Sequence, residues 1–361
     1  MRPVMSFSFP TGRTCAALTA AVTLTFATAG AAFAGDHAAG VRTLSVPSAE
    51  RGTELDVTVW YPAASGGTPV TLGENIFFQG TAAMQDAPVA PGQHPVIVLS
   101  HGAGLGGRPS AASWLATPLA EAGYIVAAPT HPGNTGPDRS AEQTMKLWQR
   151  PADLSRALDA LEMAPDLTAH ADPDRVGALG LSMGGNSALG LAGARIDPDL
   201  LAGYCDDADR NPSLCSWVRM SGVDLHAMDM TVAGRDNSDD RIGFVMAIDP
   251  APADVFAAES LAEVTMPVAL VNLGQEAGIP ATIRAAPLAQ GIPGADYTVI
   301  EGATHAAMFP ECKPKAAEIA REEGIEDPIC PDGTGRPRAD LHAQMIDMVA
   351  SAFAEAFDTA E

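Results

Sequence analysis

Aromatic and basic residues are both scarce in this chain. Of its 361 residues 5% are aromatic, and 21 Lys and Arg stand against 44 Asp and Glu, which gives a net charge of −23. Nucleic acids and anionic membrane surfaces bind clustered basic side chains, and single strands also stack on aromatic ones. The composition therefore argues against these partners. It leaves a neutral or weakly charged small molecule as the expected ligand.

The N-terminal apolar stretch, residues 15–26, is shorter than the ~20 residues that a membrane-spanning helix needs. Arg2 and Arg13 precede this stretch, and residues 32–34 read Ala-Phe-Ala, the small-x-small pattern that signal peptidase cuts. We therefore expect residues 1–34 to be a cleaved signal peptide. The mature chain would be exported to the periplasm or the medium, without a stable membrane anchor.

Cysteine is rare too. Cys15 lies in the predicted leader, and the other four cysteines are an even number in an oxidising compartment. Of their three possible pairings we favour Cys205–Cys215 with Cys312–Cys330, because each pair brackets a short loop rich in Pro and Asp. The chain has no Cys-x-x-Cys motif and no Cys–His cluster, so we expect neither a metal nor another cofactor.

Hydrophobic residues make up 47% of the chain, enough for a full core, and their pattern alternates between two kinds of segment. Short apolar runs without alternation are typical of strands buried on both faces of a parallel sheet. They lie at 95–100, 124–128, 175–180, 242–248, 267–272 and 297–300. Segments of helical period lie at 111–122, 152–163, 183–195, 283–290 and 339–357. The alternation predicts βαβ units, hence an α/β fold with a mostly parallel central sheet flanked by helices.

Three further segments complete the predicted domain, which covers residues 35–361. Residues 54–61 alternate apolar and polar side chains and predict a half-buried strand. Residues 63–94 are rich in Gly, Pro and Ala, and we expect a loop there. Residues 196–240 are polar and lack periodicity, so we expect a small, disulfide-bearing cap inserted over the carboxyl edge of the sheet. The cap and the 63–94 loop are expected to line the acyl pocket.

The motif that points to chemistry is Gly-x-Ser-x-Gly, formed by Gly180, Ser182 and Gly184. It lies directly between a predicted buried strand and a predicted helix, which is the context of a nucleophile elbow. Gly180 and Gly184 allow the backbone to close a sharp turn, and the turn lifts the Ser182 hydroxyl above the sheet. Ser182 is therefore the candidate nucleophile.

A serine nucleophile needs a base and a group that orients the base. His305 follows the last predicted strand, and we favour it as the base. We expect His94, His170, His226 and His342 to lie at the surface or in the cap. For the acid we favour Asp249, which ends a buried strand, over Glu276, which lies in the loop after the next strand.

Two backbone N–H groups are expected to bind the oxyanion. One belongs to Met183, the residue after the nucleophile. The other is assigned to Ala103, in the Ser-His-Gly-Ala-Gly turn at 100–104 that follows the predicted strand 95–100.

Taken together, these motifs resemble the α/β-hydrolase superfamily, and within it the secreted "predicted dienelactone hydrolase" group related to platelet-activating-factor acetylhydrolase. The likeness extends over nearly the whole mature chain. It is carried by the segments 59–62, 99–102, 127–134, 180–185, 247–250 and 302–305. In the acetylhydrolases the acid follows the strand after that of the nucleophile, which matches Asp249. True dienelactone hydrolases use a cysteine nucleophile, whereas this chain has Ser182.

The resemblance implies a secreted serine esterase that acts on short to medium acyl esters, small or lipid-like, through an acyl-enzyme. Three other activities use the same fold. A polyester or cutinase-like hydrolase has a similar Ser-Met-Gly-Gly elbow, an acyltransferase passes the acyl group to an alcohol, and an amidase cleaves amides. A binding protein without turnover would usually have lost Ser182 or His305, and both are present.

Overall fold

A ten-stranded sheet lies at the centre of the computed structural model, which describes residues 37–358 except 136–137, 326–327 and 333–334. The predicted leader, 1–34, falls outside these residues. The strands are β1 (Ala38–Ser48), β2 (Thr53–Ala63), β3 (Thr68–Leu72), β4 (Thr81–Gln85), β5 (His94–Ser100), β6 (Ile125–Pro129), β7 (Ala171–Leu181), β8 (Phe244–Ile248), β9 (Val268–Leu273) and β10 (Asp296–Ile300). Their order in the sheet is β10-β9-β8-β7-β5-β6-β2-β1-β4-β3.

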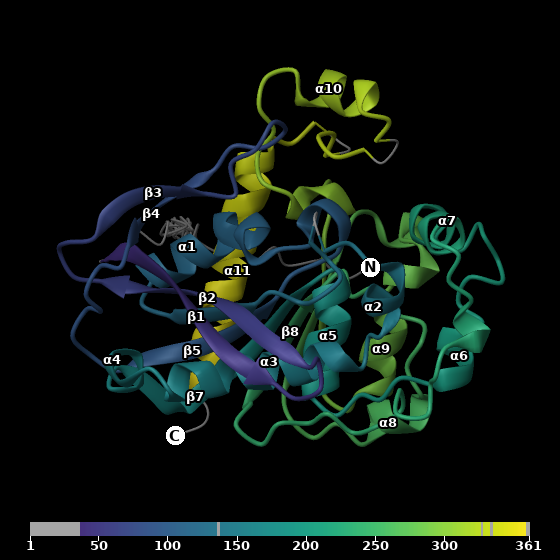
Figure 1. Ribbon diagram of the computed structural model, residues 1–361, viewed down its shortest axis with the longest axis horizontal. Helices are drawn as coiled ribbons and strands as arrows, with labels where there is room; N and C mark the ends of the chain where they lie inside the picture. The colour runs from purple at the N-terminus through teal and green to yellow at the C-terminus, as the bar shows by residue number, and fades with distance from the viewer. Residues whose placement is uncertain (1–36, 136–137, 326–327, 333–334, 359–361) are drawn as a thin grey trace, which may run out of the picture. The chain divides into compact units, whose positions relative to one another are not determined.

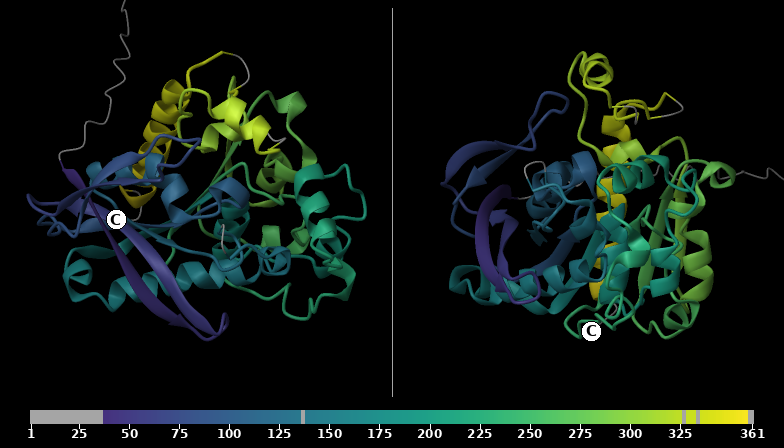
Figure 2. Two further views of the ribbon diagram at one scale, coloured as in Figure 1. Left: turned by 45° about the horizontal axis from the view of Figure 1, so that its top comes forward. Right: turned by 45° about the vertical axis from the view of Figure 1, so that its right-hand side comes forward.

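The strands β5 to β10 are all parallel, as the apolar runs predicted. The strand β2 pairs antiparallel with both β6 and β1. Figure 2 shows β1 and β2, in purple, as a long twisted ribbon at this side of the sheet. The predicted α/β class with a mostly parallel sheet is therefore confirmed.

Helices cover both faces of the sheet (Figure 1). They are α1 (Ser113–Glu121), α2 (Ala141–Met145), α3 (Gln149–Glu162), α4 (Pro165–Thr168), α5 (Met183–Leu191), α6 (Pro198–Ala202), α7 (Pro212–Met220), α8 (Ala258–Ala262), α9 (Ala286–Gly291), α10 (Ala316–Glu322) and α11 (Arg338–Asp358). The helices α3, α5, α8 and α9 pack on one face, and α1 and α11 pack on the other. No helix in the described part of the chain is long and apolar enough to cross a membrane.

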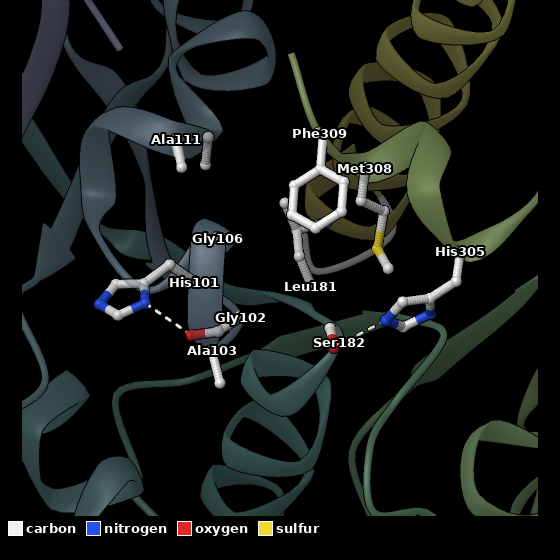
Figure 3. Close-up of a pocket in the computed structure, with 11 residues that line it drawn as sticks. His101, Gly102, Ala103, Gly106, Ala111, Leu181, Ser182, His305, Met308 and Phe309 are labelled. Carbon is white, nitrogen blue, oxygen red and sulfur yellow. Dashed lines mark hydrogen bonds between the residues drawn. The ribbon is translucent and has the colours of Figure 1, made fainter. Parts of the chain in front are cut away.

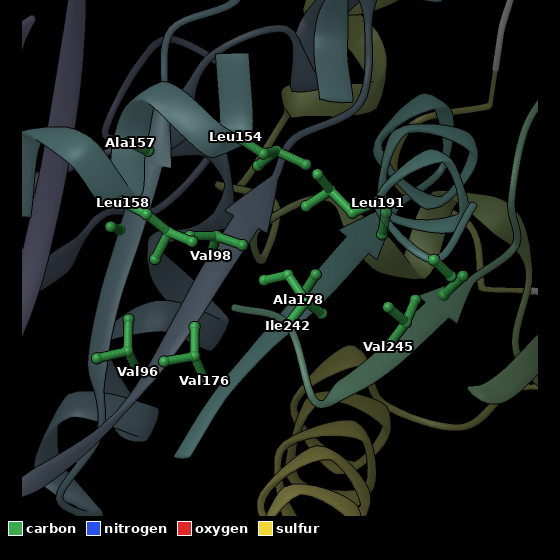
Figure 4. Packing of buried hydrophobic residues seen from close by; sticks show 14 of the residues in the cluster. Val96, Val98, Leu154, Ala157, Leu158, Val176, Ala178, Leu191, Ile242 and Val245 are labelled. Carbon is green, nitrogen blue, oxygen red and sulfur yellow. The ribbon is translucent and has the colours of Figure 1, made fainter. Parts of the chain in front are cut away.

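Alternate residues of each central strand enter one or the other of two hydrophobic cores. In β5, Val96 and Val98 face α3, while Ile97 and Leu99 face α1 and α11. Figure 4 shows Leu158 of α3 close to these valines. Burying a Val or Leu side chain stabilises the fold by ~1.5–3 kcal/mol, so both cores help to hold the central strands, whose carboxyl ends carry the site, in place.

The outer strands β1, β3 and β4 were not predicted from the sequence. The segment 63–94 is not a continuous loop, since it contains the antiparallel pair β3–β4. The residues of β3 and β4 give little apolar alternation. These strands are held mainly by backbone pairing with each other and with β1, which a local pattern does not reveal.

The segment 196–240 contains the short helices α6 and α7 and a single 3₁₀ turn, η3 (Leu225–Ala227). A disulfide joins Cys205 to Cys215 within it, with Sγ atoms 2.09 Å apart. A second disulfide joins Cys312 to Cys330 around α10, with an S–S distance of 2.03 Å. Both pairs are those that the sequence favoured.

Candidate active site

Ser182 occupies a sharp turn between β7, which ends at Leu181, and α5, which begins at Met183. Its backbone angles are φ 55° and ψ −121°, a conformation that costs a residue with a side chain on the order of 1–3 kcal/mol. Hydrogen bonds on both sides hold the turn. The Ser182 N–H donates to the Ile248 carbonyl at 3.0 Å, and the Ser182 carbonyl accepts from Gly185 N at 2.8 Å and Ala251 N at 2.9 Å.

The two glycines of the motif lie where no side chain fits. A Cβ atom on Gly184 would lie 1.9 Å from the carbonyl oxygen of Ser100, and one on Gly180 would lie 2.1 Å from the carbonyl oxygen of Gly184. Both distances are far inside van der Waals contact. The first turn of α5 therefore packs directly against the end of β5, which brings Ser182 to the carboxyl edge of the sheet.

Ser182, His305 and Asp249 form a continuous hydrogen-bonded chain. Ser182 Oγ is 3.0 Å from His305 Nε2 (Figure 3), and His305 Nδ1 is 2.9 Å from Asp249 Oδ2. A carboxylate only accepts hydrogen bonds, so Nδ1 of the imidazole carries the hydrogen and Nε2 is free to accept from the serine. The Asp249 side chain is fully buried, and the His305 side chain is 39% exposed.

Asp249 lies directly after β8 and is held from the neighbouring strand. Its Oδ1 accepts from Asn272 Nδ2 and from Leu273 N, both at 2.8 Å. The role of Asn272 was not predicted from the sequence. The signal available there was a polar residue near the end of a buried apolar run. The other candidate acid, Glu276, is exposed on the 3₁₀ turn η4 (Glu276–Gly278). Of the two candidates, it is Asp249 that contacts the His305 imidazole.

A small pocket of about 70 Å³ opens above Ser182 (Figure 3). Its lining residues are His101, Gly102, Ala103, Gly106, Ala111, Ala112, Leu181, Ser182, His305, Met308 and Phe309. None of them belongs to 63–94 or 196–240, so the expectation that these segments line the pocket is wrong. The walls come instead from the segment after β5 and from η6 (His305–Met308) with the residue that follows it.

Of the two residues predicted to bind the oxyanion, Ala103 lines this pocket and Met183 directly follows Ser182. Met183 is the first residue of α5, whose N-terminal end carries a partial positive charge. A Cβ atom on Gly102 would lie 3.4 Å from Cβ of Ser182, so the turn that carries Ala103 lies against the serine.

Two histidines expected at the surface are buried. His94 binds the carbonyl oxygens of Gly123 and Ala90 through its two ring nitrogens, at 3.0 and 3.1 Å. His342 stacks on Trp114, with ring centroids 3.9 Å apart. Burial lowers the pKa of His342 to about 4. His94 is the first residue of β5 and His342 lies within α11, and both elements pack on the core. The polarity of a single histidine did not reveal that it would be buried there.

Within the described residues no cluster of three His, Cys, Asp or Glu side chains could hold a metal ion. The described site thus offers a hydroxyl, an imidazole, a carboxylate and backbone N–H groups. These are the groups of nucleophilic acyl transfer.

Comparison with known proteins gives one family and several similar structures. The family model described as "Alpha/beta hydrolase family" matches residues 97–321. No curated protein matches the sequence. Among solved structures, a ferulic acid esterase from Streptomyces cinnamoneus superposes with a TM-score of 0.57 at 20% identity, covering 88% of this chain and 89% of that one. This likeness shows a shared fold.

Two further solved structures are less similar. A dienelactone hydrolase from Anabaena variabilis has a TM-score of 0.39 at 18% identity, covering 80% of this chain and 97% of that one. A dienelactone hydrolase-like promiscuous phosphotriesterase from metagenomic libraries has a TM-score of 0.48 at 13% identity, covering 88% and 99%.

Proposed function

Since the chain belongs to the alpha/beta hydrolase family, we propose that it is a serine esterase that cleaves carboxylic esters with short to medium acyl chains. The observation that carries the proposal is the hydrogen-bonded chain from Ser182 through His305 to Asp249 at the base of a pocket. In this proposal Ser182 is the nucleophile, His305 the general base and acid, and Asp249 the group that orients the imidazole and stabilises its cation.

The reaction has two steps. Ser182 Oγ attacks the ester carbonyl while His305 Nε2 takes the hydroxyl proton, and the alcohol leaves with that proton. Water then attacks the acyl-enzyme and gives a proton to His305, which passes it to Ser182 Oγ as the bond between Ser182 and the acyl group breaks and the carboxylic acid leaves. The N–H groups of Met183 and Ala103 would bind the oxyanion in both steps, and each such donor is worth about 10²–10³ in kcat.

The size of the pocket supports a small acyl group. Its volume of about 70 Å³ is about half that of the ~150 Å³ apolar cavity that accommodates benzene. Leu181, Met308 and Phe309 give it an apolar wall. A neutral ester also fits the excess of acidic residues in the chain, which would repel an anionic substrate.

Residues 196–240 would act as a small cap at the side of the site. Leu201, Cys215 and Val218 of this segment share a hydrophobic cluster with Met183, and Ala103 packs against that cluster. The cap would therefore support the loops that carry the oxyanion donors, without itself lining the pocket.

Export is part of the proposal. The two disulfides fit an oxidising compartment, and the leader at 1–34 would direct the chain there. Intact-mass measurement of the protein secreted by its host tests this, with a mature chain that starts at Gly35 expected. A full-length chain with both disulfides reduced would contradict it.

The decisive test is turnover of p-nitrophenyl esters from acetate to palmitate by wild type, by Ser182→Ala and by Ser221→Ala, which changes an exposed serine. We expect an optimum at short or medium chains, loss of activity only in Ser182→Ala, and a fluorophosphonate adduct on Ser182. Activity that survives in Ser182→Ala would overturn the mechanism. Ester product formed from an added alcohol would indicate acyl transfer, and cleavage of anilides without esters would indicate an amidase.

A further inference from the structure

The guanidinium of Arg150 is fully buried beneath the turn that follows β5. Arg150 lies in the first turn of α3, and the structure gives its side chain four acceptors. It donates to the His101 carbonyl, to Ser100 Oγ at 3.3 Å, to Asn134 Oδ1 at 3.2 Å and to Ser187 Oγ at 2.9 Å. None of these acceptors is a carboxylate. The Asp153 carboxylate attracts the charge of Arg150 from nearby but is not one of these acceptors. Burying a cation whose direct acceptors are all neutral is costly, so these contacts call for an explanation.

On one side, this guanidinium binds the segment that carries Ala103, one of the two proposed oxyanion donors. The His101 carbonyl that accepts from Arg150 Nη2 lies two residues before Ala103. The same nitrogen donates to Ser100 Oγ, at the end of β5. The turn from Ser100 to Ala103 is therefore fastened to α3.

On its other side, the Arg150 guanidinium is linked to the segment that carries Met183, the other proposed oxyanion donor. Arg150 Nε donates to Ser187 Oγ, and Ser187 Oγ donates to the Met183 carbonyl at 3.1 Å. Ser187 lies one helical turn after Met183 in α5. One guanidinium thus connects both backbone segments whose N–H groups would bind the oxyanion.

A buried chain of side chains supports this arrangement from behind. Ser100 Oγ is 2.9 Å from His131 Nε2, and His131 Nδ1 is 2.8 Å from Asp153 Oδ2. Arg51 donates to both oxygens of Asp153, at 3.0 and 2.6 Å. Ser100 is fully buried, so this second Ser–His–Asp chain does not meet substrate.

The ring of His101 completes the support. Its Nε2 accepts from the backbone N–H of His131 at 3.3 Å, and its Nδ1–H donates to the Gly102 carbonyl at 2.9 Å. Burial lowers the pKa of both His101 and His131 well below the ordinary value. Each ring is therefore neutral at pH 7, with one donor and one acceptor nitrogen, as these contacts require.

We propose that Arg150 is a positioning residue that fixes the two oxyanion-binding segments relative to each other. The inference rests on the proposed function for its catalytic consequence. Backbone donors stabilise an oxyanion only when they are held within about 0.5 Å of the productive geometry. Arg150 supplies that constraint through the His101 carbonyl on one side and through Ser187 on the other.

The test compares Arg150→Met, Arg150→Lys and Ser187→Ala in the full chain. For Arg150→Met we expect kcat on the preferred ester to fall about 100-fold, the size of one lost oxyanion donor, with KM within about threefold of wild type. Arg150→Lys keeps the charge and one donor group, so we expect its kcat to lie between those of wild type and Arg150→Met. Ser187→Ala keeps the His101 contact and is expected to lose about fivefold, because the Met183 side alone is loosened.

An alkyl boronic acid forms a tetrahedral adduct with the serine. In each of these three variants its affinity should fall by the same factor as kcat, while the affinity for the product carboxylate stays unchanged.

Arg241→Met is the matched control. Arg241 also has several partners, namely Asp239, Asp159, Glu162 and the Ser155 carbonyl, but none of them lines the pocket. Its removal should lower the melting temperature without changing kcat.

A folded Arg150→Met with kcat within threefold of wild type would overturn the inference, as would a loss confined to KM. If Arg150→Met does not fold, unchanged kcat and boronate affinity in Ser187→Ala overturn it in the same way.

Amide hydrogen exchange provides a readout that needs no turnover. Gly106 N donates to the Ala103 carbonyl at 3.1 Å, and His131 N donates to the His101 ring, so both amides report opening of the turn. Faster exchange at these amides in Arg150→Met supports the positioning role even if wild type cleaves no ester, in which case only the proposed function fails. Unchanged exchange rejects the role.

Discussion

The ring of Phe78 stacks on the ring of Phe309, with centroids 5.5 Å apart and planes at 17°. Phe78 is buried in the connection between β3 and β4, and Phe309 forms part of the pocket wall above Ser182. Backbone contacts strengthen the connection, since Gln79 N donates to the Glu311 carbonyl at 2.8 Å. The segment between β3 and β4 therefore supports the pocket from behind rather than lining it.

This relationship predicts where acyl-chain preference is set. Phe309→Ala should enlarge the pocket and move the optimum of the p-nitrophenyl ester series to acyl chains longer by about two to four carbons, because an apolar methylene gains ~0.8 kcal/mol when it is buried. The measurement is kcat/KM against chain length. Ile76→Ala is the control, since Ile76 lies on the same connection but is 59% exposed. An unchanged optimum in Phe309→Ala would place the acyl chain elsewhere.

The choice of acid is testable by paired amide substitutions. Asp249→Asn should lower kcat by about 10³–10⁴, because an amide does not hold the imidazole in the required tautomer or stabilise its cation. Glu276→Gln changes an exposed side chain and should leave kcat within twofold. Steady-state kinetics on the best ester measure both. The reverse result, with activity lost only in Glu276→Gln, would make Glu276 the acid.

The two disulfides should contribute stability more than activity. Each closes a short loop, with sequence separations of 10 and 18, and loops of this size stabilise the fold by roughly 3 kcal/mol in the chain-entropy model. Reduction should therefore lower the melting temperature and leave most of the esterase activity at 25 °C. Double Cys→Ser variants of each pair separate the two contributions. Loss of activity at full helical content in the variant lacking Cys312 and Cys330 would show that this bridge shapes the pocket.

Stability should decrease as the pH falls from 6.5 to 4. Burial lowers the pKa of His342 to about 4 from an ordinary 6.5, so in this window the unfolded chain binds a proton that the folded chain does not. The free energy of unfolding then falls by up to about 3 kcal/mol across the window. His101 and His131, whose pKa values burial also lowers, act in the same direction.

Urea unfolding at a series of pH values measures this dependence. His342→Gln keeps an N–H donor near the Ala307 carbonyl, which His342 Nε2 contacts at 2.9 Å, but it cannot titrate in this range. The variant should show a shallower loss of stability between pH 6.5 and 4 than wild type. Equal slopes in both proteins would mean that His342 binds its proton equally in the folded and unfolded chains.

The features that the sequence predicted well are those set by neighbouring residues. Strand β7, the turn at Ser182 and helix α5 follow from an apolar run, two glycines and a helical period within about twenty positions. The inner parallel strands β5 to β9 were likewise readable, because burial on both faces leaves a nearly uninterrupted apolar run. The cysteine pairs were favoured for a similar local reason, the short loops between them.

Relations between distant segments were decided only by the tertiary structure. The sequence favoured Asp249 over Glu276 as the acid but did not exclude Glu276. The packing of β8 beside β9 brought Asp249 to the imidazole, with Asn272 and Leu273 of β9 as donors to its carboxylate. The pocket walls and the buried contacts of Arg150 were unforeseen for the same reason. A chain's local pattern encodes each element's buried faces, but the side chains that meet where elements converge depend on strand order and register, which form only when the whole sheet assembles.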